Sequence, residues 1–187
     1  MNYNGFNQNN RELEKQAKNI ISANHLLGVA FPEHRGRWTE TADDSELNKK
    51  HIDYIAPDGF KIDLKGISDN YGKLSISVFR KYENGKLFQV LDTGIDGYLI
   101  VNMPHSSLGI NAADVYTISP EQIQNILRDF PLNSCRTKKE KTSDGWRTQY
   151  IADIALPSEI SAVFGKYDNK YISYVTSIKW GHWHNLI

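Results

Sequence analysis

Apolar residues recur at helical spacing near the start of the chain. From Arg11 onward, the positions that recur at spacings of three and four are Leu13, Ala17, Ile20, Asn24 and Leu27, of which all but Asn24 are apolar. This spacing is typical of an amphipathic helix, with Asn9 or Asn10 available as N-cap and Gly28 near the end. The preceding segment is asparagine-rich and has no repeating apolar position. We therefore expect a flexible tail over residues 1–10 and a single domain over residues 11–187.

Two pairs of alternating segments predict β-hairpins. Residues 51–56 and 60–66 flank Pro57-Asp58-Gly59, a strong turn signature. Residues 73–81 and 86–91 flank a second turn at Glu83-Asn84-Gly85. Between the helix and the first hairpin, residues 31–46 contain proline, glycine and many polar side chains. We expect a long loop there.

The second half of the chain predicts a buried strand and another helix. Residues 98–101 form a continuous apolar run, which is typical of a central strand. Ser119-Pro120-Glu121-Gln122 places proline at the first helical position, and an apolar stripe follows as far as Phe130-Pro131. The remaining pattern predicts a polar loop over 133–145, strands near 149–154 and 171–178, and a short helix at 157–164. This order of elements predicts an α/β or mixed α+β domain.

The composition favours one intracellular domain. The chain has 187 residues, of which 40% are hydrophobic and 24% charged, enough for one sizeable core. No apolar run approaches the roughly 18 residues of a membrane span, and the N-terminus lacks the pattern of a signal peptide. Cys135 is the only cysteine, so no internal disulfide can form, and we expect a cytoplasmic location.

The net charge is neutral, with 22 basic and 22 acidic residues. It therefore supplies no overall field that would steer nucleic acid to the protein. A nuclease can still be neutral, because metal-binding carboxylates offset the basic residues that contact phosphate.

The first hairpin brings acidic residues together. If Pro57-Asp58-Gly59 is a three-residue loop, counting outward places Asp53 opposite Asp63. Cross-strand neighbours have Cβ atoms about 4.5–5.5 Å apart, so the two carboxylates repel unless a cation compensates. Lys65 is two residues from Asp63 and shares its face of the strand. A loop of two or four residues would instead separate the carboxylates.

Phosphodiester hydrolysis needs this combination of groups. Mg²⁺, or Mn²⁺ as a substitute, prefers oxygen ligands, neutralises phosphate and activates water, and an ammonium group stabilises developing charge. The alternative is a solvent-facing hairpin in which Asp63 and Lys65 are ordinary polar residues.

Asp53, nine intervening residues and then Asp63-Leu64-Lys65 resemble the motif of the PD-(D/E)xK nuclease superfamily. Its core pattern, αβββαβ, broadly matches residues 11–154. The resemblance implies a restriction-endonuclease-like core, with a central mixed sheet flanked by helices. It also implies that Asp53 and Asp63 are metal ligands and that Lys65 is the catalytic lysine.

Superfamily members often add a glutamate from the first helix. Glu12 and Glu14 both flank the apolar stripe, and we favour Glu14. The sequence departs from the pattern in two ways. Ile52 replaces the proline before Asp53, and the segment after Lys65 predicts a hairpin where a helix is commoner.

Two groups of basic residues are candidates for phosphate contact. Arg35 and Arg37 precede the first hairpin, beside Trp38. The second group lies around Trp146, which could stack on a base, and comprises Arg136, Lys138, Lys139, Lys141 and Arg147. The alternative is packing on the protein surface for the first group and a solvated loop for the second. His182-Trp183-His184 lacks a third metal ligand nearby.

These patterns favour a Mg²⁺-dependent endonuclease acting on DNA, most simply duplex DNA. A restriction-type, phage or mobile-element enzyme acting as a homodimer would place two sites about a twofold axis. The alternative from another class is a nuclease-fold protein without cleavage activity that binds nucleic acid or inhibits another protein. A structure-selective junction resolvase would share the same chemistry.

Overall fold

The computed structural model describes residues 4–42, 51–68, 72–91, 94–103, 112–142, 145–157 and 170–179. The helices in these residues are α1 (Asn4–Asn24), α2 (Leu26–Ala30) and α4 (Pro120–Asp129). The strands are β1 (Thr39–Glu40), β2 (Tyr54–Ile55), β3 (Lys61–Ile67), β4 (Lys73–Tyr82), β5 (Leu87–Gln89), β6 (Gly97–Asn102), β7 (Ala112–Ile118), β8 (Arg136–Thr142), β9 (Gly145–Ala155) and β10 (Ser173–Lys179).

The strands form two sheets. Sheet A has the order β1-β2-β3-β6-β7-β10, and sheet B has the order β5-β4-β9-β8. Strands β3 and β6 pair in parallel, whereas the neighbours of β3 and β6 on their other sides are antiparallel. The protein is therefore mixed α+β with a mixed sheet, which confirms the predicted class at this level.

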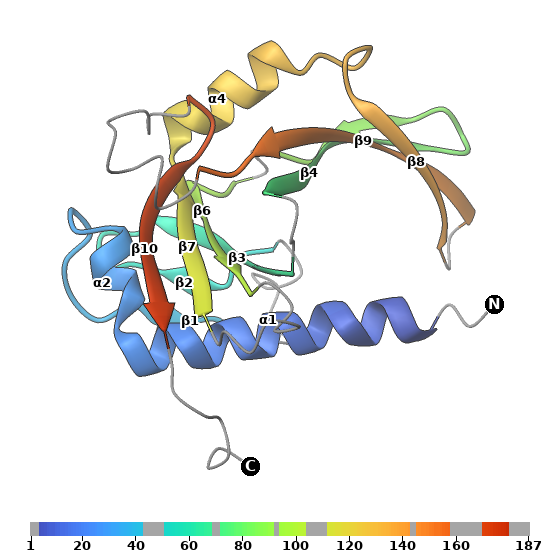
Figure 1. Ribbon diagram of the computed structural model, residues 1–187. Coiled ribbons are helices and arrows are strands. Elements are labelled where there is room, and N and C mark those ends of the chain that lie inside the picture. Colours follow the sequence, from blue (N-terminus) through green and yellow to red (C-terminus); the bar gives the residue numbers. More distant parts are fainter. Residues whose placement is uncertain are drawn as a thin grey trace.

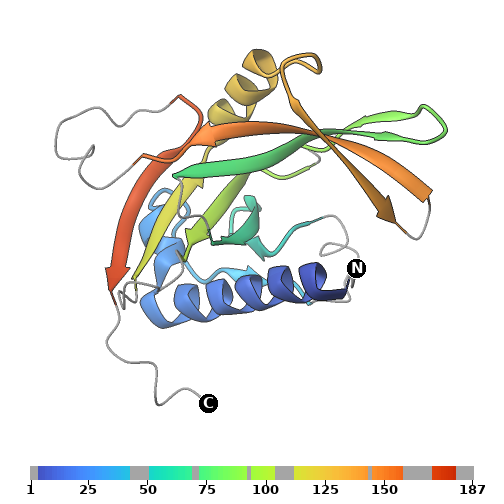
Figure 2. The same ribbon diagram turned by 45° about the vertical axis from the view of Figure 1, so that its right-hand side comes forward.

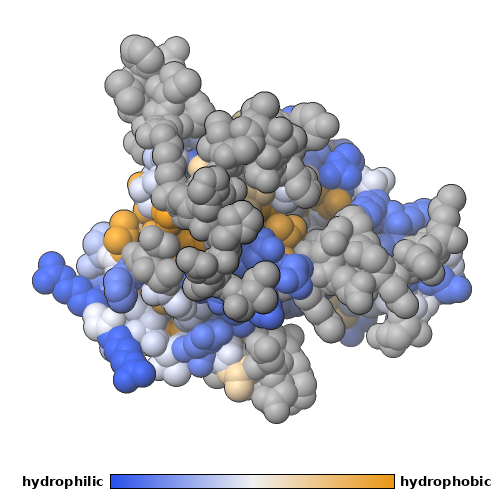
Figure 3. Space-filling view, turned by 60° about the horizontal axis from the view of Figure 1, so that its bottom comes forward, coloured by the Kyte–Doolittle hydropathy of each residue, from blue (hydrophilic) through white to orange (hydrophobic). Residues whose placement is uncertain are grey.

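The elements lie in layers. Helix α1 runs along one face of sheet A, while α4 and sheet B lie on the other side (Figure 1). One apolar core fills the space between α1 and sheet A, and a second lies among sheet A, sheet B and α4. The β4 and β9 strands form a long twisted ribbon that extends past sheet A (Figure 2). Seen from below, the described surface carries both hydrophilic side chains and apolar ones, and several of the apolar ones lie between its left side and its centre (Figure 3).

Helix α1 lies unusually close to β3. The side chains of Ile62 and Leu64 pack into the core beneath the helix. Two residues further along the same face, a Cβ built on Gly66 would lie 2.4 Å from the carbonyl oxygen of Leu13. Only glycine therefore lets the helix backbone approach the strand at this point.

Most of the predicted elements are present. Both hairpins form at the expected turns, as β2–β3 and β4–β5, and all six residues of β6 are buried. The chain passes from β3 to the parallel strand β6 through the β4–β5 hairpin, as the sequence predicted. Ser119 caps α4 in a capping box with Gln122, and Pro120 begins the helix. Strands β9 and β10 occupy the regions predicted near 149–154 and 171–178.

Other predictions were wrong. The first helix begins at Asn4 rather than Arg11, and α2 continues past Gly28. The expected polar loop over 133–145 contains β8. This edge strand is polar on both faces, so it lacks the alternation that marks a half-buried strand. Short β1 lies in the expected loop over 31–46, and β7 was not predicted. The helix expected at 157–164 lies almost wholly outside the described residues.

No helix in the described part of the chain is both long enough and apolar enough to cross a membrane.

Candidate metal and catalytic site

The β2–β3 hairpin has the predicted register. Tyr54 pairs with Ile62 and Ile55 with Lys61. At the turn, the N–H of Ala56 donates to the carbonyl of Phe60 at 2.9 Å. The intervening loop therefore contains three residues, as expected.

Regular pairing ends at Tyr54. The N–H of Asp53 also donates to Ile62, the partner of Tyr54, at 2.9 Å, so the pairing is offset at Asp53 in the manner of a β-bulge. The Oδ2 of Asp53 then accepts the N–H of Leu64 at 2.7 Å. The carboxylate is thus fixed against the edge of β3.

Thr41 holds the backbone of this segment in place. Its N–H donates to the carbonyl of Asp53 at 2.9 Å, and its hydroxyl donates to the carbonyl of Ile52 at 2.5 Å. Thr41 and Asp53 are both buried. The chain before the hairpin therefore supports the position of the Asp53 carboxylate.

Asp63 is buried between a carboxyl group and an ammonium group. Lys65 Nζ lies 2.8 Å from Asp63 Oδ1 and 2.7 Å from Oδ2. Burial raises the pKa of Asp63 to about 7, and the charge of Asp53 and a hydrogen bond with it act in the same direction, whereas Lys65 opposes them. The two carboxyl groups thus share one buried acidic site, and Asp63 keeps its proton to a higher pH than an ordinary aspartate does.

His51 and Arg80 lie close to this site, although the sequence did not single them out. His51 adopts a left-handed backbone conformation with φ of 61°. Desolvation lowers its pKa, and the charges of Lys65 and then Arg80 lower it further. Arg80 comes from β4, and its Nε is buried with no hydrogen-bond partner among the described residues. The position of Arg80 near this site could not be predicted from the sequence, because it depends on how sheet B packs on sheet A.

Glu14 does not join the two aspartates in a cluster. Its backbone lies opposite Gly66 on the α1 face of β3. Its charge contributes to the raised pKa of Tyr54, about 12, which is due first to burial. Within the described residues, no group of three or more acidic, histidine or cysteine side chains is placed to hold a metal ion.

Arg35 and Arg37 lie at the other end of the hairpin. Gly36 between them packs on Pro57 at the turn, where an added Cβ would be 2.8 Å from the proline ring. Pro57 is four residues from Asp53, a span of roughly 13 Å along a strand. Both arginines are exposed but are not brought to the carboxylates.

The second basic group lies on sheet B. Lys138, Lys139 and Lys141 are exposed on β8, rather than in a loop, and Arg147 lies on β9. The carboxylate of Glu140 accepts a hydrogen bond from Arg147. These residues are therefore separate from the carboxylate pair, on an arm formed by two hairpins.

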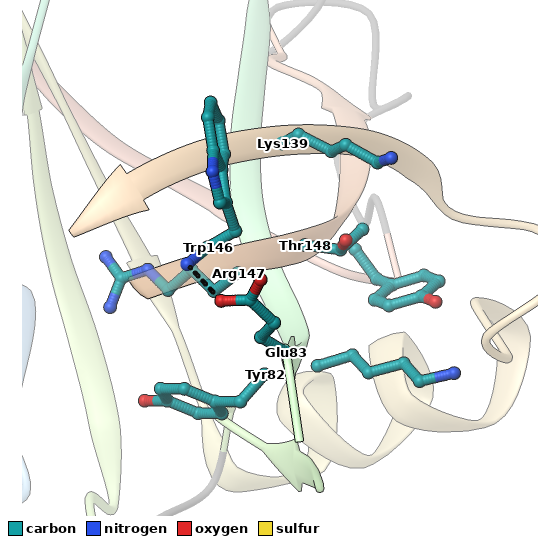
Figure 4. Close-up of a pocket in the computed structure, with 8 residues that line it drawn as sticks. Tyr82, Glu83, Lys139, Trp146, Arg147 and Thr148 are labelled. Carbon is teal, nitrogen blue, oxygen red and sulfur yellow. Dashed lines mark hydrogen bonds between the residues drawn. The ribbon is translucent and has the colours of Figure 1, made fainter. Parts of the chain in front are cut away.

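A hollow of about 590 Å³ lies at the end of this arm. The backbone N–H of Trp146 donates to the carboxylate of Glu83 at the wall of the hollow, at 3.3 Å. Lys139 and Thr148 point to one side, and Arg147 points to the other (Figure 4). The lining residues are Lys81, Tyr82, Glu83, Lys139, Trp146, Arg147, Thr148 and Tyr150.

Cys135 and the 182–184 segment add no reactive group to the described part of this site. The thiol of Cys135 donates to the carbonyl of Phe130 at 3.4 Å, and burial raises its pKa. A thiol with a raised pKa is a poor nucleophile at neutral pH. The 182–184 segment lies outside the described residues.

The donor set of Asp53 and Asp63 fits Mg²⁺ or Mn²⁺. Both offer carboxylate oxygens, and Mg²⁺ is commonly held by one or two carboxylates together with water. A divalent cation would also offset the charge of Asp53, which adds to the larger effect of burial in raising the pKa of Asp63. The pair therefore has the composition and electrostatics of a small hard-cation site.

The chain matches no protein-family model, and no curated protein matches it significantly.

Proposed function

We propose that this protein is a Mg²⁺-dependent endonuclease that cleaves DNA at the Asp53–Asp63–Lys65 site. The observation that carries the proposal is the buried contact between the two carboxyl groups, with an ammonium group on one of them. A buried acidic pair costs stability unless it serves a charged partner. Perturbed groups of this kind cluster at functional sites.

Each residue has a distinct role in this proposal. Asp53 and Asp63 hold the cation, and the N–H of Leu64 fixes the direction of Asp53. When bound, Mg²⁺ supplies neutralisation of phosphate charge and acidifies water. The side chain of Lys65 is 42% exposed, so its ammonium can also reach a phosphate oxygen from solvent. Lys65 thereby stabilises charge that develops on the phosphate during cleavage.

The surrounding arrangement supports a restriction-endonuclease-like core. Helix α1 covers the sheet that carries the acidic hairpin, and β6 lies parallel to β3 next to it. Two copies of such a domain related by a twofold axis would cut both strands of a duplex. The hairpin crossover through β4 and β5 is where this chain departs from the commoner helical connection.

Removing the ammonium of Lys65 tests the proposal directly. Purified protein is expected to cleave plasmid DNA with Mg²⁺ or Mn²⁺ but not with EDTA. Lys65→Ala is expected to slow cleavage by about a hundredfold, because a positioned proton or charge donor contributes on that order. The rate is measured by gel electrophoresis of supercoiled, linear, branched and single-stranded substrates.

Lys61→Ala is the matched control, because Lys61 lies on the same strand and four residues away. It is expected to keep the parental rate. Circular dichroism establishes that both variants fold. Equal rates for the two variants, or cleavage that survives EDTA, would contradict the proposed site.

A second prediction concerns metal binding without cleavage. Mg²⁺ or Mn²⁺ at about a hundred times its dissociation constant is expected to raise the melting temperature by roughly 5–10 °C at pH 8. The stabilisation arises because the folded protein alone presents Asp53 and Asp63 together. Differential scanning fluorimetry with and without metal measures it.

Asp53→Asn should abolish this shift, whereas Asp129→Asn should retain it. Asp129 is a partly buried carboxylate paired with Lys170 and Arg128 on another part of the surface. A metal-dependent rise in melting temperature of the same size in both variants would show that the metal binds at another site.

The alternative is a nuclease-fold protein that binds nucleic acid or another protein without cutting. Lys65 contacts both oxygens of Asp63, and the described residues supply no third acidic ligand. Absence of cleavage on every substrate, together with absence of a metal-dependent melting shift, would favour this alternative. Preference for branched DNA would instead indicate a junction resolvase.

A further inference from the structure

The end of sheet B exposes large apolar side chains. We call this region the sheet B tip; it comprises residues 80–88 and 138–150, of which 143–144 are not described. Of the four exposed large hydrophobic residues in the described chain, three belong to the tip: Leu87, Phe88 and Trp146. Trp146 is 48% exposed and lines the hollow. Large apolar side chains that are exposed together in one region are typical of an interaction site.

The same tip is rich in cations. They come from strands β4, β8 and β9 and from the residue just before β5, and they are Arg80, Lys81, Lys86, Lys138, Lys139, Lys141 and Arg147. Lys86 also lies over the ring of Phe88, 4.5 Å from its centroid. The surface therefore combines aromatic faces with positive charge.

The described acidic residues of the tip are already engaged. Glu140 accepts hydrogen bonds from Arg147 and Gln149. Glu83 accepts the N–H of Trp146 at the wall of the hollow. The sequence adds a third acidic residue, Asp144, between the segments that form β8 and β9. Seven cations against these three carboxylates leave the tip positive in a chain whose net charge is zero.

We propose that the hollow at the sheet B tip binds an unpaired nucleotide of a nucleic-acid substrate, with its base stacked on Trp146 and adjoining phosphates on Lys81 and Lys139. Aromatic faces beside a cationic groove are the combination that binds single strands. A volume of about 590 Å³ lies within the usual range for a small-molecule site. A base held within a duplex is stacked on both sides and cannot cover the indole.

The tip is connected to the carboxylate site through β4. Lys81 lines the hollow, and its neighbour Arg80 lies close enough to His51 for their charges to interact. Arg80 also interacts electrostatically with Arg147 on β9. A nucleic-acid strand that is bound at the hollow and extends toward Lys65 would thus pass along positively charged residues. The inferred role in substrate choice rests on the proposed nuclease function, whereas binding at the hollow can be measured without it.

Binding in EDTA separates the two questions. A fluorescein-labelled twelve-nucleotide oligothymidine and a duplex of equal length are titrated with the full chain, and anisotropy is recorded. The single strand is expected to bind more tightly. Trp146→Ala is expected to weaken its binding about tenfold, because stacking one base contributes on that order. Lys139→Gln is expected to weaken binding and to reduce its dependence on salt.

Trp146→Phe is the conservative variant and should restore most of the affinity, because it retains a ring. Arg128→Gln, which removes an exposed charge from α4, should leave binding unchanged. Equal affinity of the parental and Trp146→Ala proteins for the single strand would overturn the proposal, as would duplex binding that equals single-strand binding. Tight single-strand binding without plasmid cleavage would preserve this inference and refute only the nuclease.

Discussion

Asp63→Asn is expected to abolish cleavage and, in the absence of metal, to stabilise the protein at pH 8. The loss of cleavage should be at least about a thousandfold, since metal-dependent charge stabilisation supplies several kcal/mol. The gain in stability follows from the buried pair. Asparagine keeps the shape of the carboxyl group but cannot ionise beside Asp53.

The sign of the stability change depends on pH. Folding raises the pKa of Asp63 from 3.8 to about 7. Between these values the folded protein binds a proton that the unfolded chain has lost, so the free energy of unfolding falls as pH rises. Asp63→Asn and the parental protein should therefore be equally stable near pH 4. At pH 8 the variant should be more stable by on the order of 2–4 kcal/mol.

Urea denaturation in EDTA at pH 4, 6 and 8 measures this difference. Asp129→Asn is the control, because the pKa of Asp129 shifts in the opposite direction: hydrogen bonding with Lys170 lowers it in the folded protein. The Asp129→Asn variant should therefore gain no stability relative to the parental protein as pH rises. A parental protein that is more stable than Asp63→Asn at pH 8 without metal would show that folding does not raise the pKa of Asp63.

Gly66→Ala should cause the largest loss of stability of any single methyl addition to the described core. The new Cβ would lie 2.4 Å from Leu13 oxygen and 2.9 Å from Glu14 nitrogen, which are backbone atoms and cannot rotate away. Helix α1 would have to move off β3 and open the core around Ala17 and Leu64. Overpacking of this kind costs about 1–3 kcal/mol and more where the backbone must shift.

Gly28→Ala is the matched control for this substitution. An added Cβ at Gly28 meets no atom within 4 Å, and the residue lies in the short helix α2. Alanine there should leave stability unchanged or raise it by roughly 0.5–1 kcal/mol. Thermal unfolding of the two variants compares them, and similar melting temperatures would mean that α1 does not rest on β3 as described.

The local parts of the candidate site could be predicted from sequence because short-range rules determine them. The turn chemistry of Pro57-Asp58-Gly59 fixes the loop length, and the loop length fixes which residues approach across the hairpin. Alternation then places Lys65 beside Asp63. The offset at Asp53 could not be predicted, because it depends on Thr41, which is distant in sequence and arrives through the segment before the hairpin.

Features that depend on contacts between distant parts of the chain could not be predicted by these short-range rules. Arg80 comes close enough to His51 for their charges to interact only because sheet B packs over sheet A, and no spacing along the chain encodes that packing. Strand β8 was missed because both of its faces are polar. The α1 helix was predicted to start late because residues 4–10 carry no apolar repeat, although their backbone continues the helix.

The lysines of β8 also bear on how the protein behaves in a crowded solution. Strand β8 is an edge of sheet B, so one row of its backbone N–H and C=O groups has no neighbouring strand in the sheet. Such edges promote sheet-to-sheet aggregation unless charge keeps other chains away. Lys138, Lys139 and Lys141 supply that charge along the exposed strand. The side chains proposed to attract phosphate thus also keep the edges of neighbouring molecules apart, and β8 cannot become apolar or neutral without a cost in solubility.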